Sequence, residues 1–203
     1  MARSRASHTH SSSIFLRKAT VRINVDLLKK VFAAAMTEFL KGERNSLRDD
    51  ISERNSCARL GYHLQNCVDR AGFKGYYADP DYNRKQGGQV KTILDQNFEI
   101  VTIQCDLLLH SRGEIVGRDN LVAIEMKKSY RPQTEKDDDR KRLRAMTKKS
   151  DGVWSYDGRT HPDHVCGYML GVFIEVDRTS ESVAIEYYRN GKFRNADPGT
   201  WKF

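Results

Sequence analysis

The sequence predicts an α/β fold in which helices flank a central mixed sheet, because helical and extended segments alternate along the chain. Apolar residues spaced three and four apart mark the helices, and short apolar or alternating runs mark the strands. The expected order is helix 27–40, helix 47–71, strands 73–83, 98–110 and 121–127, helix 135–149, and strands 165–176 and 183–188. We treat 14–203 as one domain with its core at about 47–189, after a disordered basic tail at 1–13.

The helix at 27–40 has a broad apolar face and ends before Gly42. We expect it to be an extra N-terminal helix packed on the core, although such a face can also serve a subunit interface. The helix at 47–71 carries a stripe that includes Cys57, Leu60 and Leu64. Continued backwards, this stripe reaches Glu53, and a carboxylate on a core-facing row is costly unless something binds it. The alternative is that Glu53 is a first-turn acid favoured by the helix dipole.

Three charged residues interrupt two apolar strands. Asp106 lies within the strand at 98–110, and Glu125 and Lys127 end the strand at 121–127. Residues two apart on a strand point to one face, so Glu125 and Lys127 project side by side. The polar stretch at 111–120 is a plausible hairpin connection, and in a hairpin Asp106 would join the other two.

Two carboxylates on neighbouring strands form a hard-oxygen pocket of the kind that Mg²⁺ or Mn²⁺ prefers. Such an ion polarises a phosphoryl oxygen and acidifies a bound water, and Lys127 can orient or deprotonate that water or offset negative charge on the phosphate. Glu53 can hold a second ion or a metal-bound water. The structural alternative is a buried ion pair between Lys127 and Asp106 or Glu125.

Four motifs follow one another along the chain. They are Glu53 with Arg59, Leu60 and Leu64; Tyr82, Asn83 and Arg84; DLLLHSRG at 106–113; and NLVAIEMK at 120–127. This ordered set resembles the PD-(D/E)XK nuclease superfamily, the fold of many restriction endonucleases, and within it a subset of small bacterial and phage proteins. Cys105 stands where the superfamily's name has a proline, but that proline varies and binds no metal.

The resemblance implies a restriction-endonuclease-like α-β-β-β-α-β core and a Mg²⁺- or Mn²⁺-dependent phosphodiesterase acting on nucleic acid, with DNA favoured and RNA left open. It implies Asp106, Glu125 and Glu53 as metal ligands and Lys127 as the catalytic lysine. Restriction, phage defence and repair are compatible settings. The main alternative is a non-catalytic module that binds nucleic acid or protein. Action as a homodimer or with a partner subunit also stays open.

The formal net charge of +8 is concentrated in two zones. Residues 1–30 hold seven Lys/Arg against one Asp, and residues 127–149 hold ten against four acids, so each zone carries +6. Such zones suit a polyanion, although solvated lysines explain charge alone equally well. The expected nucleic-acid contacts are Arg84, His110, Arg112, Lys128 and Arg131.

Several classes of protein are disfavoured. No run approaches the ~18 apolar residues of a membrane span, and no apolar segment follows Arg3 and Arg5 as in a secretory signal. Four scattered cysteines form neither a disulfide framework nor a C-x-x-C pair, so we expect them to be small buried residues in a reducing compartment. These features predict a cytoplasmic protein without a membrane partner.

Overall fold

The computed structural model describes residues 21–82, 92–94, 100–102, 105–149 and 167–203. The tail at 1–13 and Arg84 lie outside these residues. The helices are α1 (Val25–Gly42), α2 (Arg44–Arg48), α3 (Glu53–Arg70) and α4 (Gln133–Met146). The main sheet contains β1 (Tyr77–Pro80), β4 (Leu107–His110), β5 (Asn120–Lys128), β6 (Leu170–Asp177), β7 (Ser182–Arg189) and β8 (Lys192–Lys202). A separate pair of strands is formed by β2 (Thr92–Leu94) and β3 (Ile100–Thr102).

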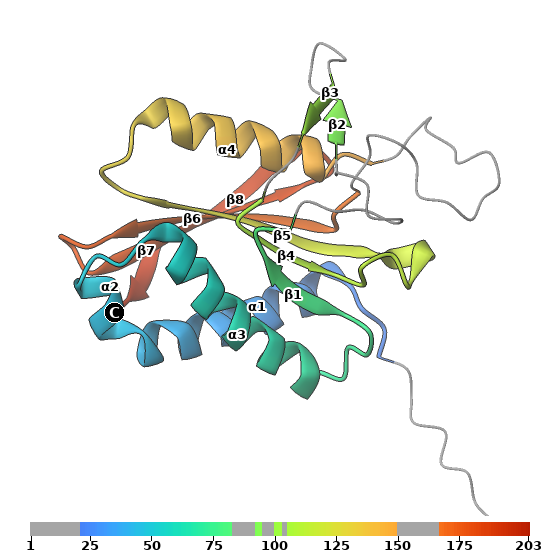
Figure 1. The fold of residues 1–203 in the computed structure, drawn as a ribbon, viewed down its shortest axis with the longest axis horizontal. Coiled ribbons are helices and arrows are strands. Elements are labelled where there is room, and N and C mark those ends of the chain that lie inside the picture. Colours follow the sequence, from blue (N-terminus) through green and yellow to red (C-terminus); the bar gives the residue numbers. More distant parts are fainter. Residues whose placement is uncertain (1–20, 83–91, 95–99, 103–104, 150–166) are drawn as a thin grey trace, which may run out of the picture.

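The six-stranded sheet is mixed, which confirms the predicted class. Its order is β1-β4-β5-β6-β7-β8, and every neighbouring pair is antiparallel except β5 and β6. Parallel neighbours need a crossover connection, and α4 lies in the one between β5 and β6. It covers one face of the sheet, and α1 and α3 lie on the other (Figure 1).

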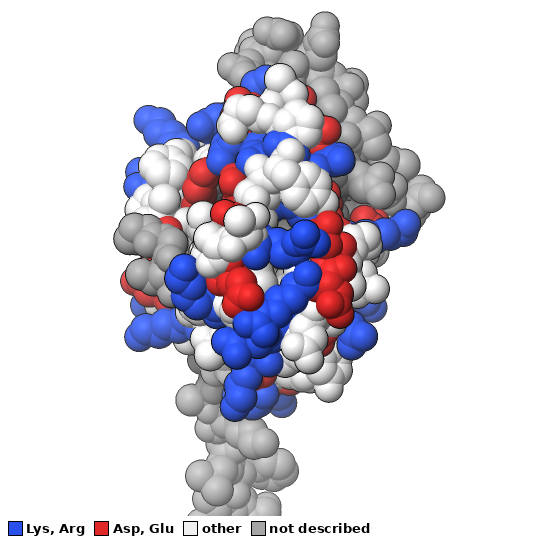
Figure 2. All heavy atoms as spheres, turned by 90° about the vertical axis from the view of Figure 1, so that its left-hand side faces the viewer, with Lys and Arg blue, Asp and Glu red and all other residues white. Residues whose placement is uncertain are grey.

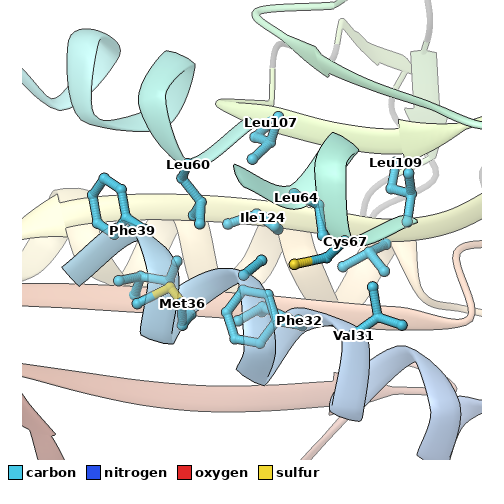
Figure 3. Packing of buried hydrophobic residues seen from close by; sticks show 14 of the residues in the cluster. Val31, Phe32, Met36, Phe39, Leu60, Leu64, Cys67, Leu107, Leu109 and Ile124 are labelled. Atoms are coloured by element: carbon cyan, nitrogen blue, oxygen red, sulfur yellow. The ribbon is translucent and has the colours of Figure 1, made fainter. Parts of the chain in front are cut away.

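The larger hydrophobic core lies between α1, α3 and the sheet (Figure 3). Phe32, Met36 and Phe39 of α1 are fully buried there, with Leu60 of α3 and Ile124 of β5. Their spacing of three and four residues places one face of α1 against the sheet. The prediction that this helix is a core element is therefore confirmed.

The predicted helix at 47–71 is wrong at its start. The chain forms the short helix α2 and then leaves helical geometry, with Asp50 at a φ of 59°. A new helix begins at Glu53, where the Ser52 side chain accepts a hydrogen bond from the backbone N–H of Asn55 at 3.2 Å. This N-cap satisfies a backbone donor that would otherwise lack a partner, so the helix starts here.

Two strand predictions need correction as well. The segment 98–110 was expected to be one strand, but β3 and β4 belong to different sheets. The last strand, β8, was not predicted. It pairs with β7 through the two-residue turn Asn190–Gly191, in which both residues have positive φ (53° and 72°). Asn-Gly favours this turn, so a local signal for the hairpin was present.

Cys57, Cys67 and Cys105 are buried and free, as expected, and Cys166 lies outside the described residues. Among the helices of the described part, none combines the length and the apolar character that crossing a membrane requires.

Candidate metal centre

Three carboxylates meet under α4. One oxygen each from Asp106, Glu125 and Asp139 lies within 4.8 Å of the other two. Asp106 directly precedes β4, and Glu125 lies on β5, next to the residue that pairs with the first residue of β4 (Leu107↔Ile124). The predicted hairpin between these strands is thus present, and it brings Asp106 and Glu125 together as expected.

Alternation along β5 decides which side chains face the site. Val122, Ile124 and Met126 join the core on the α1 and α3 side. Ala123 packs in the smaller cluster with Leu143 and Met146 of α4. Glu125 and Lys127 share the parity of Ala123, so both point toward α4.

Asp139 was not predicted as a site residue. The sequence at 135–149 has few apolar residues, but Lys136, Asp139, Leu143 and Met146 of α4 are buried. A signal was available, because the step from Met146 to Leu143 leads backwards to Asp139 at helical spacing. The same reasoning that singled out Glu53 would have found it.

Protein donors hold part of each carboxylate. Asp106 Oδ2 accepts from the backbone N–H of Met126 at 2.8 Å. Arg142 Nη1 donates to Glu125 Oε1 at 2.6 Å and to Asp139 Oδ1 at 3.0 Å. Glu125 Oε2 is buried and has no hydrogen-bond partner among the described residues. A buried oxygen without a hydrogen-bond partner destabilises the folded state, so a cation bound at this point would supply the missing interaction.

The surroundings of two of these carboxyl groups disfavour the ionised form. Burial and the neighbouring charge of Asp106 raise the pKa of Glu125 well above its usual value, although Arg142 acts in the opposite direction. Burial likewise raises the pKa of Asp106, against the backbone N–H of Met126 and the charge of Lys127. A bound cation would favour the ionised form of both groups.

Lys127 reaches the same cluster from β5. Its Nζ lies 2.8 Å from Asp139 Oδ2 and 4.0 Å from Glu53 Oε2. Burial alone would lower the pKa of Lys127, but the contact with Asp139 and the charge of Asp106 outweigh it and raise this pKa. Its closest carboxylate is therefore Asp139, not Asp106 or Glu125 as in the ion-pair alternative considered above.

Glu53 lies beside the carboxylate cluster but is not one of its three members. Its Oε1 accepts from the backbone N–H of Lys128 at 3.0 Å, and it is the first residue of α3. The first-turn position matches the dipole interpretation, and the contact with β5 brings the side chain to the site. Metal binding by Glu53 remains a prediction.

The expected nucleic-acid contacts are mostly engaged elsewhere. His110 was expected to meet phosphate, but its side chain is only 1% exposed and Nε2 lies 3.1 Å from Asp79 Oδ2. Lys128 is buried and donates to Asp50 Oδ1 at 2.5 Å. Neither side chain can reach a phosphate in this conformation, because neighbouring residues cover both.

The two remaining arginines are exposed but paired. Arg112 forms two hydrogen bonds to Asp79, of 2.7 and 2.6 Å, and Arg131 lies 2.7 Å from Glu135. Figure 2 shows basic and acidic side chains interleaved on the end of the molecule that includes α2. A phosphate contact by either arginine requires exchange of an existing partner.

The donor set fits a hard divalent cation. All three candidate ligands are carboxylate oxygens, as Mg²⁺ and Mn²⁺ prefer. Asp106, Glu125, Asp139 and Glu53 carry four formal negative charges, and Lys127, Arg142 and Arg131 carry three positive ones. The group keeps an excess of negative charge, which a bound cation would offset. Comparisons with protein-family models, with curated proteins and with solved structures found no match.

Proposed function

We propose that this chain is a metal-dependent nuclease of the PD-(D/E)XK type that hydrolyses nucleic-acid phosphodiester bonds, DNA rather than RNA. The observation that carries the proposal is the convergence of Asp106, Glu125 and Asp139 beside Lys127. Glu125 Oε2, buried and without a hydrogen-bond partner among the described residues, is an oxygen that a cation would satisfy.

The order of elements supports the same proposal. From α3 to β6 the main sheet and its helices follow the order α3, β1, β4, β5, α4, β6. This is the α-β-β-β-α-β order that the motif resemblance implies, with β2 and β3 inserted as a separate pair and α1 added in front. The three candidate metal carboxylates lie directly before β4, on β5 and on α4, within that order.

Each side chain has a distinct part in the proposed reaction. A Mg²⁺ or Mn²⁺ ion bound here would supply a Lewis acid and lower the pKa of a bound water. Asp106, Glu125 and Asp139 would hold the ion, and Arg142 keeps the latter two oriented. Because the pKa of Lys127 is raised, its ammonium group offsets negative charge on the phosphate better than it removes a proton.

A cleavage assay tests the proposal. Plasmid, single-stranded DNA and RNA are incubated with Mg²⁺ or Mn²⁺ and with the wild type or Asp106→Asn, Lys127→Ala or Asp139→Asn. We expect metal-dependent cutting by the wild type, and a loss of roughly 100-fold or more in each variant. Asp138→Asn is the matched control, because Asp138 is the preceding residue on α4, is exposed and pairs with Lys141. It should cut at the wild-type rate.

A non-catalytic module that binds nucleic acid or protein is the second candidate. It would predict no cutting under any condition and no metal binding by calorimetry, from a protein that is folded normally. That combined result would overturn the nuclease. Cutting that appears only after addition of a second chain would instead indicate a subunit that needs a partner.

A further inference from the structure

Six exposed cations lie at or just after the C-terminal end of α4 and on the β7–β8 hairpin. We call this group the hairpin patch; its members are Arg144, Lys148, Lys149, Arg189, Lys192 and Arg194. Arg144, Lys148 and Lys149 end the basic zone at 127–149, whereas Arg189, Lys192 and Arg194 lie in neither basic zone of the sequence. The group therefore requires a separate explanation.

The hairpin turn brings these residues into one place. The backbone N–H of Gly191 donates to the carbonyl of Thr147 at 3.2 Å, which ties the turn to the end of α4. Gly191 and Lys148 are also in close contact, since a Cβ added at Gly191 would lie 3.1 Å from Cγ of Lys148. Lys148, Lys149 and Arg189 line one shallow depression of about 330 Å³. Residues more than 40 positions apart thus form one continuous surface.

Within the described residues these cations form no ion pair with a carboxylate, unlike the earlier cations of the basic zone at 127–149. Seven cations earlier in the same basic zone each lie within 3.1 Å of a carboxylate: Lys127, Lys128, Arg131, Lys136, Arg140, Lys141 and Arg142. The dipole of α4 favours a cation in its last turn, which accounts for Arg144. It does not account for three more on the hairpin.

An exposed aromatic ring lies within the patch. Phe193 lies between Lys192 and Arg194 in the sequence, is 47% exposed, and meets Tyr188 edge-on with ring centroids 5.9 Å apart, and the Arg144 guanidinium lies 5.6 Å from the centre of the Tyr188 ring. Tyr188 belongs to the cluster under α4 and pairs with Phe193 across the hairpin, so both rings lie on the α4 side of the sheet. Cations combined with an exposed ring suit phosphates and an unpaired base.

We propose that the hairpin patch binds a single-stranded stretch of nucleic acid, with the cations on its phosphates and Phe193 stacked on a base. Asp139 lies seven residues before Met146, the last residue of α4, which is about 10 Å along the helix axis, and Lys148 follows two residues later. A strand of a few nucleotides can span that distance to the metal centre. This last step rests on the proposed nuclease function, whereas the binding itself does not.

The test is fluorescence anisotropy of a labelled 20-nucleotide single-stranded DNA in EDTA, where no cutting occurs. The triple variant Lys148→Gln, Lys149→Gln, Arg189→Gln is expected to bind roughly 10- to 100-fold more weakly than the wild type. The slope of log K against the logarithm of the salt concentration should be less steep by about 2 in this variant, because each lost phosphate contact to a single strand reduces the slope by ~0.7. The matched control replaces Lys30, Lys41 and Lys74 by Gln, because these lysines are exposed and lie outside the patch. It should bind like the wild type.

Phe193→Ala isolates the stacking. It should weaken binding of the single strand by roughly tenfold and leave binding of a blunt duplex unchanged, with a normal melting temperature showing that the variant folds. Equal binding by the two triple variants would overturn the proposal. So would binding of phosphatidylserine vesicles, but not of the oligonucleotide, through the same lysines. An inactive protein that still binds through the patch would refute the nuclease alone.

Discussion

Glu125 combines complete burial with an oxygen that has no hydrogen-bond partner in the described part of the chain. Its pKa is raised by burial, so the folded protein binds a proton here more tightly than the unfolded chain does. The stability of the metal-free protein should therefore fall as the pH rises above the ordinary glutamate pKa of 4.5. Below that pH the carboxyl is protonated in both the folded and the unfolded state, and the folded protein keeps its full stability there.

Glu125→Gln should remove this contribution. At pH 8 in EDTA we expect the variant to be more stable than the wild type by about 1–3 kcal/mol, and the difference should shrink toward pH 4.5. Urea unfolding at several pH values measures both. A variant that is less stable than the wild type at pH 8 would mean that the contact with Arg142 outweighs burial.

The site residues that the sequence revealed share one property. Asp106, Glu125 and Lys127 are charged residues inside apolar strands, and period-two alternation then predicts which of them point together. Asp139 was missed because its helix has few apolar residues to mark its buried face. The partners of His110 and Lys128 could not be predicted, because composition does not show that Asp79 and Asp50 pair with them.

At the scale of elements, the position of α4 determines the metal centre, because it carries both Asp139 and Arg142. Gly171 of β6 allows α4 to approach the sheet. A Cβ at this position would lie 3.0 Å from Thr147 Cγ2 and 3.1 Å from Tyr188 Cβ. Both contacts are tight, and neither belongs to the far end of a flexible side chain.

Gly171→Ala should therefore destabilise the protein by about 1–3 kcal/mol, the usual cost of overpacking. It should also weaken metal binding, since a displaced α4 moves Asp139. Thermal unfolding and calorimetry measure these effects. Gly117→Ala serves as the control, because a Cβ there meets nothing within 4 Å and its change should stay within about 0.5 kcal/mol. Equal stability of the two variants would show that α4 is not held by this contact.

Elements with strong periodicity were predicted well, and those that depend on caps and turns were not. The apolar face of α1 and the alternation of β5 are set by residues at fixed spacing, so they can be predicted without knowing the conformation of the loops. The break between α2 and α3 depends instead on the Ser52 cap, and β8 on the Asn190–Gly191 turn. Both signals are local and were outweighed by apolar patterns nearby.

At the scale of the whole molecule, the two halves of the basic zone at 127–149 behave differently. Its first part is neutralised by carboxylates that are distant in sequence, such as Asp50, Glu175 and Glu186. Among the residues that the structure describes, the cations at its end have no ion pair with a carboxylate, and the same holds for the cations on β7 and β8 that belong to the hairpin patch. Net charge along a sequence cannot show this, because ion pairs are made by the fold.

The metal centre should also be visible in the stability of the whole molecule. An ion that binds only the folded chain stabilises it by about 2.7 kcal/mol at 100 times its dissociation constant. For a chain of this size that corresponds to a rise in melting temperature of roughly 5–10 °C. Mg²⁺ or Mn²⁺ should produce this rise in the wild type and in Asp138→Asn, but not in Asp106→Asn or Asp139→Asn.

The rise should be smaller at pH 5 than at pH 8, because protons compete with the ion for Glu125 and Asp106, whose pKa values are raised. An equal rise in melting temperature in all four proteins would mean that the ion binds elsewhere. A rise of the same size at pH 5 and pH 8 would mean that Glu125 and Asp106 do not bind it.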